Sequence, residues 1–484
     1  MRVLNVKTQK EEWEWMAFHL PHEIVQVLQQ TSVLEKLLAA DGMDPVALEH
    51  LDSCEQDAGC PLMGLGLWGD ECPCCWDRSE SLAVLSLSLP GLTGANSTIR
   101  IPITCFGEKQ KGPNTWQDIM SVVKWSLEIL ATGQPAEARH DGSQWLKSDT
   151  KRKAGKAVQR SCLVEVRADW KFMAGVFKFP AHNLNEGICW ACTCKPEEVS
   201  HILSIYIYVL NYVSQVREAA ATAGWRSSPL SHGDVIARLL ARGHQLNPLL
   251  EAPWVKTSIF RRDWLHCSDQ GVAADFLGNL FHHLQWKYLE ETKKERYAAL
   301  YQDMDRFYAD EKVQDRLDCL LEGMVEQSKG YKLRCSAAEC RALVPFGYSL
   351  ACELCDLSDP LEEAIYFAAF HLNEVYKTLS SDCQEPHRKK SEHGIKFALQ
   401  YVGLHDMVNP GDPKAWRIKP KLHLFLHVCA EDDLPSMNWC YRDEDFGGSA
   451  AARGRRRGGL RAVQAMSSST LDKFKVHTRF ICIR

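Results

Sequence analysis

The sequence predicts an α/β fold: a mixed sheet flanked by helices and interrupted by a large α-helical insertion. Residues 61–70, 82–91, 97–106 and 161–169 are strand-like, and a helical pattern at 115–133 separates the third segment from the fourth. The second segment, LAVLSLSLPG, alternates with a period of two, which is typical of a strand. A long later stretch has apolar residues every three or four positions, which predicts helices.

The length of the chain and its changes of pattern predict its domains. With 484 residues, 45% of them hydrophobic, the chain is long enough for two to four domains. We expect an N-terminal helical region at 1–60, the first part of an α/β core at 61–274, the helical insertion at 275–435, and a last helix with a basic tail at 436–484.

The composition narrows the class of protein. The formal net charge is −5 and charged residues make up 25%, so any nucleic-acid-binding surface must be local. No apolar run approaches the roughly 18 residues of a membrane span, and the N-terminus lacks the apolar core of a signal peptide, so we expect an intracellular protein with no membrane partner. The 20 cysteines are then expected to be reduced thiols, some buried and some available to a metal.

Two aspartates end strand-like segments, Asp70 the first and Asp169 the fourth. Three strands, a helix and a fourth strand is the order of a ribonuclease H-like core, in which the first and fourth strands are neighbours. Asp70 and Asp169 would then lie side by side at one sheet edge. Two-metal phosphoryl transfer needs about three carboxylates, whose oxygens suit Mg²⁺ or Mn²⁺. Glu444 is the candidate third carboxylate, on a later helix, with Asp443 and Asp445 as rivals.

Further motifs follow these aspartates in order. They are the pair Cys189 and Cys192, the pair Asp263 and His266, the set Lys421, His423 and His427, and the stretch EDFGG at 444–448. Together with Asp70 and Asp169 this set resembles the cut-and-paste DDE transposases, and it is most similar to the CACTA-type group and its Plavaka- and KDZ-like relatives. In that family the second catalytic Asp is followed by a Gly-His and Gly-Cys-x-x-Cys pattern, matched here by Gly175, His182, Gly187, Cys189 and Cys192.

The resemblance implies a metal-binding catalytic triad of Asp70, Asp169 and Glu444 that acts on DNA with Mg²⁺ or Mn²⁺. It also implies a nuclear protein that works as a homo-oligomer, with the helices between Asp263 and Glu444 as the insertion. Glu71 departs from the pattern, because related sequences often have glycine there, and it adds a carboxylate near the metals.

Cys189 and Cys192 have the spacing of a zinc half-site, and a structural zinc site needs four ligands. The remaining ligands are open between Asp263 with His266 and His182, and buried thiols at a turn are the alternative. His423 and His427 share one helix face, where they can bind zinc or simply pack. Other cysteines are expected in the interior: Cys72, Cys74 and Cys75 beside the first strand, and Cys352 and Cys355 in the helical region.

Two basic segments are candidate DNA contacts. One comprises Arg453, Arg455, Arg456 and Arg457, and the other Lys151, Arg152 and Lys153. Phosphate contact competes here with a plain solvated tail or loop. The sequence is also consistent with a second function: a truncated or domesticated, catalytically inactive transposon-derived scaffold that binds DNA or protein and is stabilised by zinc. It has no evident zinc finger or helix-turn-helix before Asp70.

Overall fold

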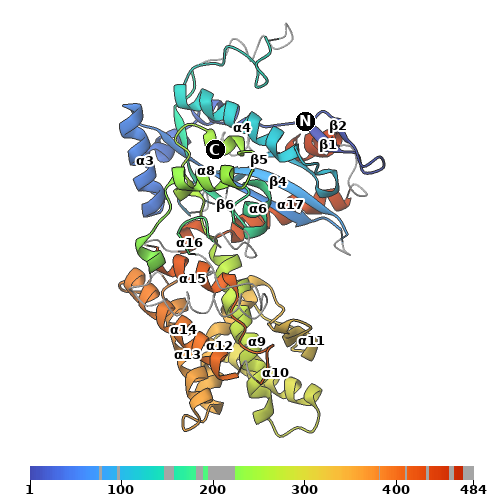
Figure 1. The fold of residues 1–484 in the computed structure, drawn as a ribbon, viewed down its shortest axis with the longest axis vertical. Helices are drawn as coiled ribbons and strands as arrows, with labels where there is room; N and C mark the ends of the chain where they lie inside the picture. The colour runs from blue at the N-terminus through green and yellow to red at the C-terminus, as the bar shows by residue number, and fades with distance from the viewer. Residues whose placement is uncertain are drawn as a thin grey trace. The chain divides into compact units, whose positions relative to one another are not determined.

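The chain forms two compact units, each built from separate stretches of sequence (Figure 1). The computed structural model describes residues 1–75, 79–94, 97, 99–145, 157–180, 189–194, 224–380, 382–408, 411–431, 435–456 and 463–472. The first unit comprises Met1–Phe179, Leu230–Arg261 and Cys440–Arg484, and the second comprises Pro180–Pro229 and Arg262–Trp439. The change of unit therefore comes at Arg261 and Arg262, ahead of the expected boundary at 274, and the stretch at 180–229 belongs with the helical unit.

The first unit contains the sheet. Its elements are β1 (Arg2–Leu4), β2 (Glu11–Trp13), α1 (Pro21–Leu28), α2 (Val33–Ala39), α3 (Pro45–Ala58), β3 (Met63–Pro73), β4 (Ser81–Ser88), β5 (Arg100–Gly107), α4 (Thr115–Thr132), β6 (Ser161–Ala168), α6 (Trp170–Val176), α8 (His232–Ala241) and α17 (Tyr441–Arg456). Short 3₁₀ turns lie at Glu108–Gln110, Pro248–Glu251 and Thr257–Ile259.

The second unit is helical among its described residues, apart from one small hairpin. Its elements are a π-helix (Leu265–Ala273), α9 (Ala274–Leu284), α10 (Lys293–Asp310), α11 (Glu322–Val325), β7 (Glu326–Gln327), β8 (Gly330–Tyr331), α12 (Ala337–Leu354), α13 (Pro360–Lys377), α14 (Pro386–Val408), α15 (Pro420–Ala430) and α16 (Pro435–Asn438). Short 3₁₀ turns lie at Gly224–Ser227 and Gln285–Lys287. No helix among the described residues of either unit is long and apolar enough to cross a membrane.

The main sheet has four strands in the order β5-β4-β3-β6. β3 pairs antiparallel with β4 and parallel with β6, and β4 pairs antiparallel with β5. The expected mixed α/β fold is therefore confirmed, with the first and fourth predicted strands as neighbours. The hairpin of β1 and β2 was not predicted, because strands of three residues are too short to show a periodic pattern.

One face of the sheet packs against aromatic residues of the helices that follow β5 and β6. The ring of Phe172, from α6, lies 5.0 Å from the ring of Trp116, from α4. Phe172 also packs directly over β3 at Gly69, where an added Cβ would come 2.2 Å from its ring. Glycine is required here because any side chain would push α6, and with it the residue that begins α6, away from the sheet.

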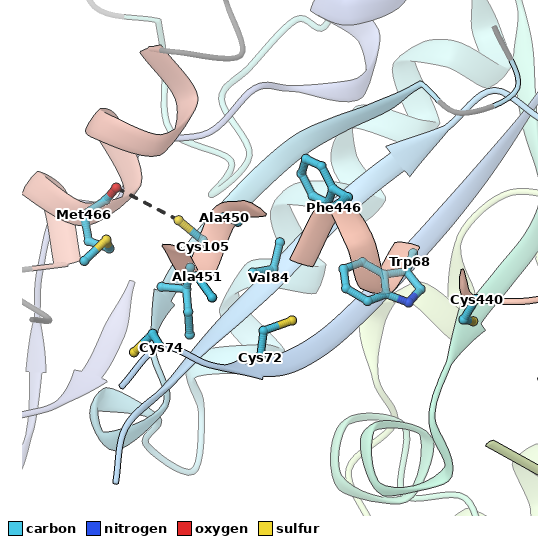
Figure 2. Packing of buried hydrophobic residues seen from close by; sticks show 11 residues of the cluster. Trp68, Cys72, Cys74, Val84, Cys105, Cys440, Phe446, Ala450, Ala451 and Met466 are labelled. Carbon is cyan, nitrogen blue, oxygen red and sulfur yellow. Dashed lines mark hydrogen bonds between the residues drawn. The ribbon is translucent and has the colours of Figure 1, made fainter. Parts of the chain in front are cut away.

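The opposite face of the sheet is covered by α17 (Figure 1). Side chains alternate along a strand, so Trp68, Asp70 and Cys72 share one face of β3. Figure 2 shows Trp68 and Cys72 of β3 beside Phe446 of α17 in a buried cluster. The helix approaches closely because Gly447 faces the strand: an added Cβ would lie 2.3 Å from the Cys72 sulfur.

A buried group of charges fixes the first turn of α17 on this face. The Asp443 carboxylate is fully buried and forms ion pairs with Arg100 of β5 and, at 3.5 Å, with Arg167 of β6. Arg167 also lies 3.2 Å from the carboxylate of Glu165. Charges removed from water are tolerated only when each finds a partner, so these four side chains specify one position of the helix over the strands.

Replacing Asp443 by Asn should destabilise the first unit strongly, because Arg100 and Arg167 would keep their buried charges with only Glu165 left to balance them. We expect a loss of about 3–5 kcal/mol in the free energy of unfolding, measured by urea denaturation. Asp445→Asn, two residues along the helix and exposed, is the matched control and should change the same quantity by less than about 0.5 kcal/mol. Equal effects of the two substitutions would contradict a buried anchor.

In the second unit, a buried carboxylate holds the π-helix against α13. Asp269 Oδ1 accepts hydrogen bonds from Trp264 Nε1 at 3.1 Å and from the Tyr376 hydroxyl at 2.6 Å.

The α13–α14 pair also brings two histidines together, with His371 Nδ1 3.0 Å from His393 Nδ1. Burial, together with the neighbouring His393, lowers the pKa of His371 to about 4.

This histidine pair should make the helical unit sensitive to acid. The folded state holds His371 neutral down to about pH 4, whereas an unfolded histidine takes up a proton near pH 6.5. The unfolded state therefore binds more protons between those values, so the free energy of unfolding should fall as the pH is lowered from about 6.5 towards 4. His371→Gln should flatten that part of the stability–pH curve; an unchanged slope would argue against the pair.

Candidate functional site

Asp70 and Asp169 lie on neighbouring strands, as the order of elements predicted, at the point where the pairing of β3 with β6 ends. The predicted strand end at Asp70 was wrong, because β3 continues along β4 to Pro73. Gly69 of β3 pairs in parallel with Ala168 of β6. Asp70 follows Gly69 in the sequence, and Asp169 follows Ala168. Asp169 is also the N-cap of α6, since its Oδ1 accepts a hydrogen bond from the Phe172 amide at 2.6 Å. The packing of α6 over Gly69 therefore positions Asp169 next to β3.

Glu444 reaches the same part of the sheet from α17. It lies one helical turn before Gly447, the residue in contact with Cys72 and Trp68, so both point to the same side of the helix. Phe446 packs edge-on against Trp68 at 6.4 Å between ring centroids. The helix thus carries a carboxylate to the face of β3 on which Asp70 lies.

The pKa of the Cys72 thiol depends on the charges of three carboxylates. Burial raises the pKa of Cys72, and the negative charges of Asp70, Glu444 and Asp169 raise it further. The Cys72 sulfur lies 3.9 Å from Asp70 Oδ2. Three separated parts of the sequence therefore bring carboxylates to this region of the sheet, with Asp70 and Glu444 on the same face of β3.

The structure separates the three acids that compete at 443–445. Asp443 is buried in its ion pairs with arginines, and Asp445 is exposed to solvent. Glu444, which is half-buried, is the acid that belongs to the charges around Cys72. Among the described residues, two groups place three or more metal-type ligand atoms within 4.8 Å of one another, and the acids at the sheet edge are in neither.

Glu71 takes part in a different interaction. It forms an ion pair with Lys111 and another with Lys171 at 2.6 Å. Burial opposes the ionisation of Glu71, but these two ammonium groups outweigh it and hold the pKa of the carboxyl below its usual value. Because neighbouring strand residues point to opposite faces, Glu71 is directed away from the face that bears Asp70.

One group within 4.8 Å consists of Cys189, Cys192, His423 and His427. His427 Nε2 lies 3.6 Å from the Cys189 sulfur, 3.3 Å from the Cys192 sulfur and 3.1 Å from His423 Nε2. Ligands bound to one tetrahedral zinc at about 2.0–2.3 Å stand roughly 3.3–3.8 Å apart. The four atoms are thus spaced close to what a tetrahedral zinc site requires.

The surroundings of this Cys₂His₂ group favour metal binding. Both cysteines are buried, and the two histidines come from successive turns of α15. Trp225 packs against both imidazole rings, at 4.8 Å from His423 and 4.6 Å from His427. Burial lowers the pKa of His427 to about 4, so the imidazole is neutral at physiological pH, the form that binds metal.

Asp263 and His266 are not the partners of the two cysteines. Asp263 Oδ2 accepts hydrogen bonds from the His266 backbone amide at 3.0 Å and its Nδ1 at 2.6 Å, and Oδ1 accepts one from the Leu265 amide. The hydrogen bonds of Asp263 therefore stabilise the start of the π-helix. His182, the other predicted partner of the two cysteines, lies outside the described residues. The motif around His423 and His427 was visible in the sequence, but its pairing with cysteines more than 230 residues away was not.

The other group within 4.8 Å is Cys74, Cys75 and Glu80, at the β3–β4 connection. Burial raises the pKa of Cys74 to about 11, so it is a protonated thiol at neutral pH. Glu80 lies 3.7 Å from the Cys75 sulfur and 3.4 Å from the Lys109 ammonium. Cys72 and Cys74 are buried beside β3, as expected.

The predicted DNA-contacting residues are only partly described. Arg453 and Arg455 lie in the last turns of α17, and Arg455 Nη1 donates to the Pro73 carbonyl at 3.4 Å. Arg456 is in the same helix. The remaining four, Arg457, Lys151, Arg152 and Lys153, lie outside the described residues.

The sequence matches no protein-family model, and no curated protein matches it either. The fold and the side-chain geometry are therefore the grounds on which function is inferred.

Purified protein should contain about one equivalent of zinc per chain, measured by elemental analysis. Cys192→Ser should lose this zinc and lower the thermal midpoint, because folding and metal binding are coupled at such sites. Cys352→Ser is the matched control: this cysteine was expected in the core but is exposed, so the prediction of its burial was wrong and its loss should change neither quantity. Full zinc retention by Cys192→Ser would rule out the site.

Proposed function

We propose that the chain is a transposase-like, divalent-metal-dependent enzyme that cleaves DNA phosphodiester bonds and joins strands. The observation that carries this proposal is that Asp70 and Asp169 follow paired residues of neighbouring strands, while α17 brings Glu444 to the face of β3 that bears Asp70. The strand order β5-β4-β3-β6, with β3 parallel to β6, is that of a ribonuclease H-like core and supports the same reading.

The donor set fits Mg²⁺ or Mn²⁺, because all three side chains offer hard carboxylate oxygens. Divalent ions at such a site activate an attacking oxygen and stabilise the leaving oxygen of the phosphodiester. The part of the protein is to hold the acids in place. Asp169 is fixed by its capping bond to α6, and Glu444 by the buried ion pairs of the neighbouring Asp443.

DNA and a second copy of the chain are the partners this proposal requires, and the nucleus is the compartment. Lys171 lies two residues after Asp169, is largely exposed, and is joined through Glu71 to Lys111. These lysines, with the arginines that end α17, could neutralise phosphates of a strand that approaches the acids.

The carboxylates can be tested by substitution. Supercoiled DNA incubated with protein and Mn²⁺ should be nicked, and Asp70→Asn, Asp169→Asn and Glu444→Gln should each lower the rate by about 100-fold or more. Asn is as good an N-cap as Asp, so Asp169→Asn should leave α6 intact. Asp445→Asn, on the same helix and exposed, should keep the wild-type rate.

A catalytically inactive, zinc-stabilised scaffold is the second candidate function. The favouring observation is that the Cys₂His₂ ligand atoms already lie within 4.8 Å of one another, whereas the acids at the sheet edge do not form such a group among the described residues. This candidate predicts stoichiometric zinc with no Mn²⁺-dependent nicking by the wild-type protein. Nicking lost in Glu444→Gln but kept in Asp445→Asn would exclude it.

A further inference from the structure

We propose that the first unit has a second site, an aromatic cavity that binds an unpaired nucleobase of a DNA strand. The proposal rests on the proposed function for the identity of the ligand as nucleic acid. The cavity has a volume of about 760 Å³ and is walled by the segment before α1, by α1 and α4, and by the stretch that follows α4.

Aromatic rings dominate the lining. Trp125 of α4 lies at the centre of a group of rings, with Trp145 at 6.1 Å, His140 at 6.2 Å and His22 at 5.2 Å between ring centroids. Trp15 also lines the cavity yet is 77% exposed, so a large part of its ring surface is open to a ligand. Exposed tryptophan costs hydration free energy, and a planar partner would remove that cost.

The volume and charge of the cavity favour a neutral, planar, ring-shaped ligand. Its charged side chains are Glu14, Glu23 and Arg139, so no large excess of either charge lines the cavity. Burial lowers the pKa of His140, which favours its neutral form. The cavity volume of about 760 Å³ is far larger than a single ammonium group needs.

Among neutral planar ligands, a nucleobase fits best. Bases stack on tryptophan and histidine rings whatever their sequence, and amides can pair with their polar edges. Gln26 and Gln30 supply such amides in the lining.

A strand held at the acidic site would have to pass around the end of the sheet to reach the cavity, because α4 packs on the face opposite Asp70. β5 runs in the same direction as β3, so α4 begins near the sheet edge that bears Asp70. Trp125 lies ten residues after Thr115, the start of α4. At 1.5 Å per residue this is about 15 Å, or roughly four to five stacked nucleotides.

The test uses the full chain and a single-stranded oligonucleotide with 2-aminopurine as the probe base, in EDTA so that no cleavage can occur. Insertion between rings should quench the probe fluorescence. Trp15→Ala should weaken binding about 5- to 150-fold, the range for loss of one base–aromatic stack. Trp13→Ala is the matched control, because Trp13 is 75% exposed and is not part of the lining. An abasic residue in place of the probe should reduce wild-type affinity to the level of Trp15→Ala.

Several outcomes would overturn the assignment. Equal affinities of wild type and Trp15→Ala would do so, as would equal losses in Trp13→Ala and Trp15→Ala. An unquenched probe would leave the cavity to an aromatic side chain of a protein partner. The two proposals can also fail separately. Base binding without Mn²⁺-dependent nicking would exclude the proposed enzyme activity and support the base-binding cavity. Nicking that is unaffected by Trp15→Ala, with no quenching of the probe, would support the enzyme activity and exclude the base-binding cavity.

Discussion

The ion pairs of Asp443 are the interaction on which the acidic site depends. Gly447, Phe446 and the buried alanines of α17 also pack on the sheet, but these apolar contacts are less directional than the ion pairs. The two arginines come from β5 and β6, which lie at opposite edges of the four-stranded sheet. The Asp443 carboxylate therefore joins α17 to both edges of the sheet. Because Glu444 is the next residue of α17, its position is fixed as well.

The two candidate metal sites offer different types of ligand atom. Under the proposed function, the hard carboxylate oxygens at the sheet edge would hold exchangeable Mg²⁺ or Mn²⁺. Buried thiols and neutral imidazoles in the helical unit suit a closed structural zinc. The thiol and imidazole ligand atoms already lie within 4.8 Å of one another, as expected of a site that stabilises structure, whereas the acids at the sheet edge form no such group among the described residues.

Local pattern was sufficient to put Asp70 and Asp169 on neighbouring strands, because each strand shows its periodicity within a few residues, although β3 runs three residues beyond Asp70. The sequence already made Glu444 the candidate, but separating it from its rival Asp443 needed the tertiary structure, since burial beside Arg100 and Arg167 is invisible in a run of three acids. The partners of Cys189 and Cys192 were hidden for another reason: nothing in the sequence links a Cys-x-x-Cys to a helix 231 residues later. Short strands such as β1 and the exposure of Cys352 likewise depend on neighbours, not on pattern.

Because the first unit is discontinuous, its completion has to wait during synthesis. The strands β3 to β6 are made within the first 168 residues, but the helix that covers Trp68 and Cys72 ends at Arg456. A ribosome adding about 5–20 residues per second leaves that apolar face uncovered for tens of seconds. The nascent chain thus exposes an apolar sheet face for much of its translation. We expect its yield in cells to depend on chaperones that cover this face until α17 has been synthesised.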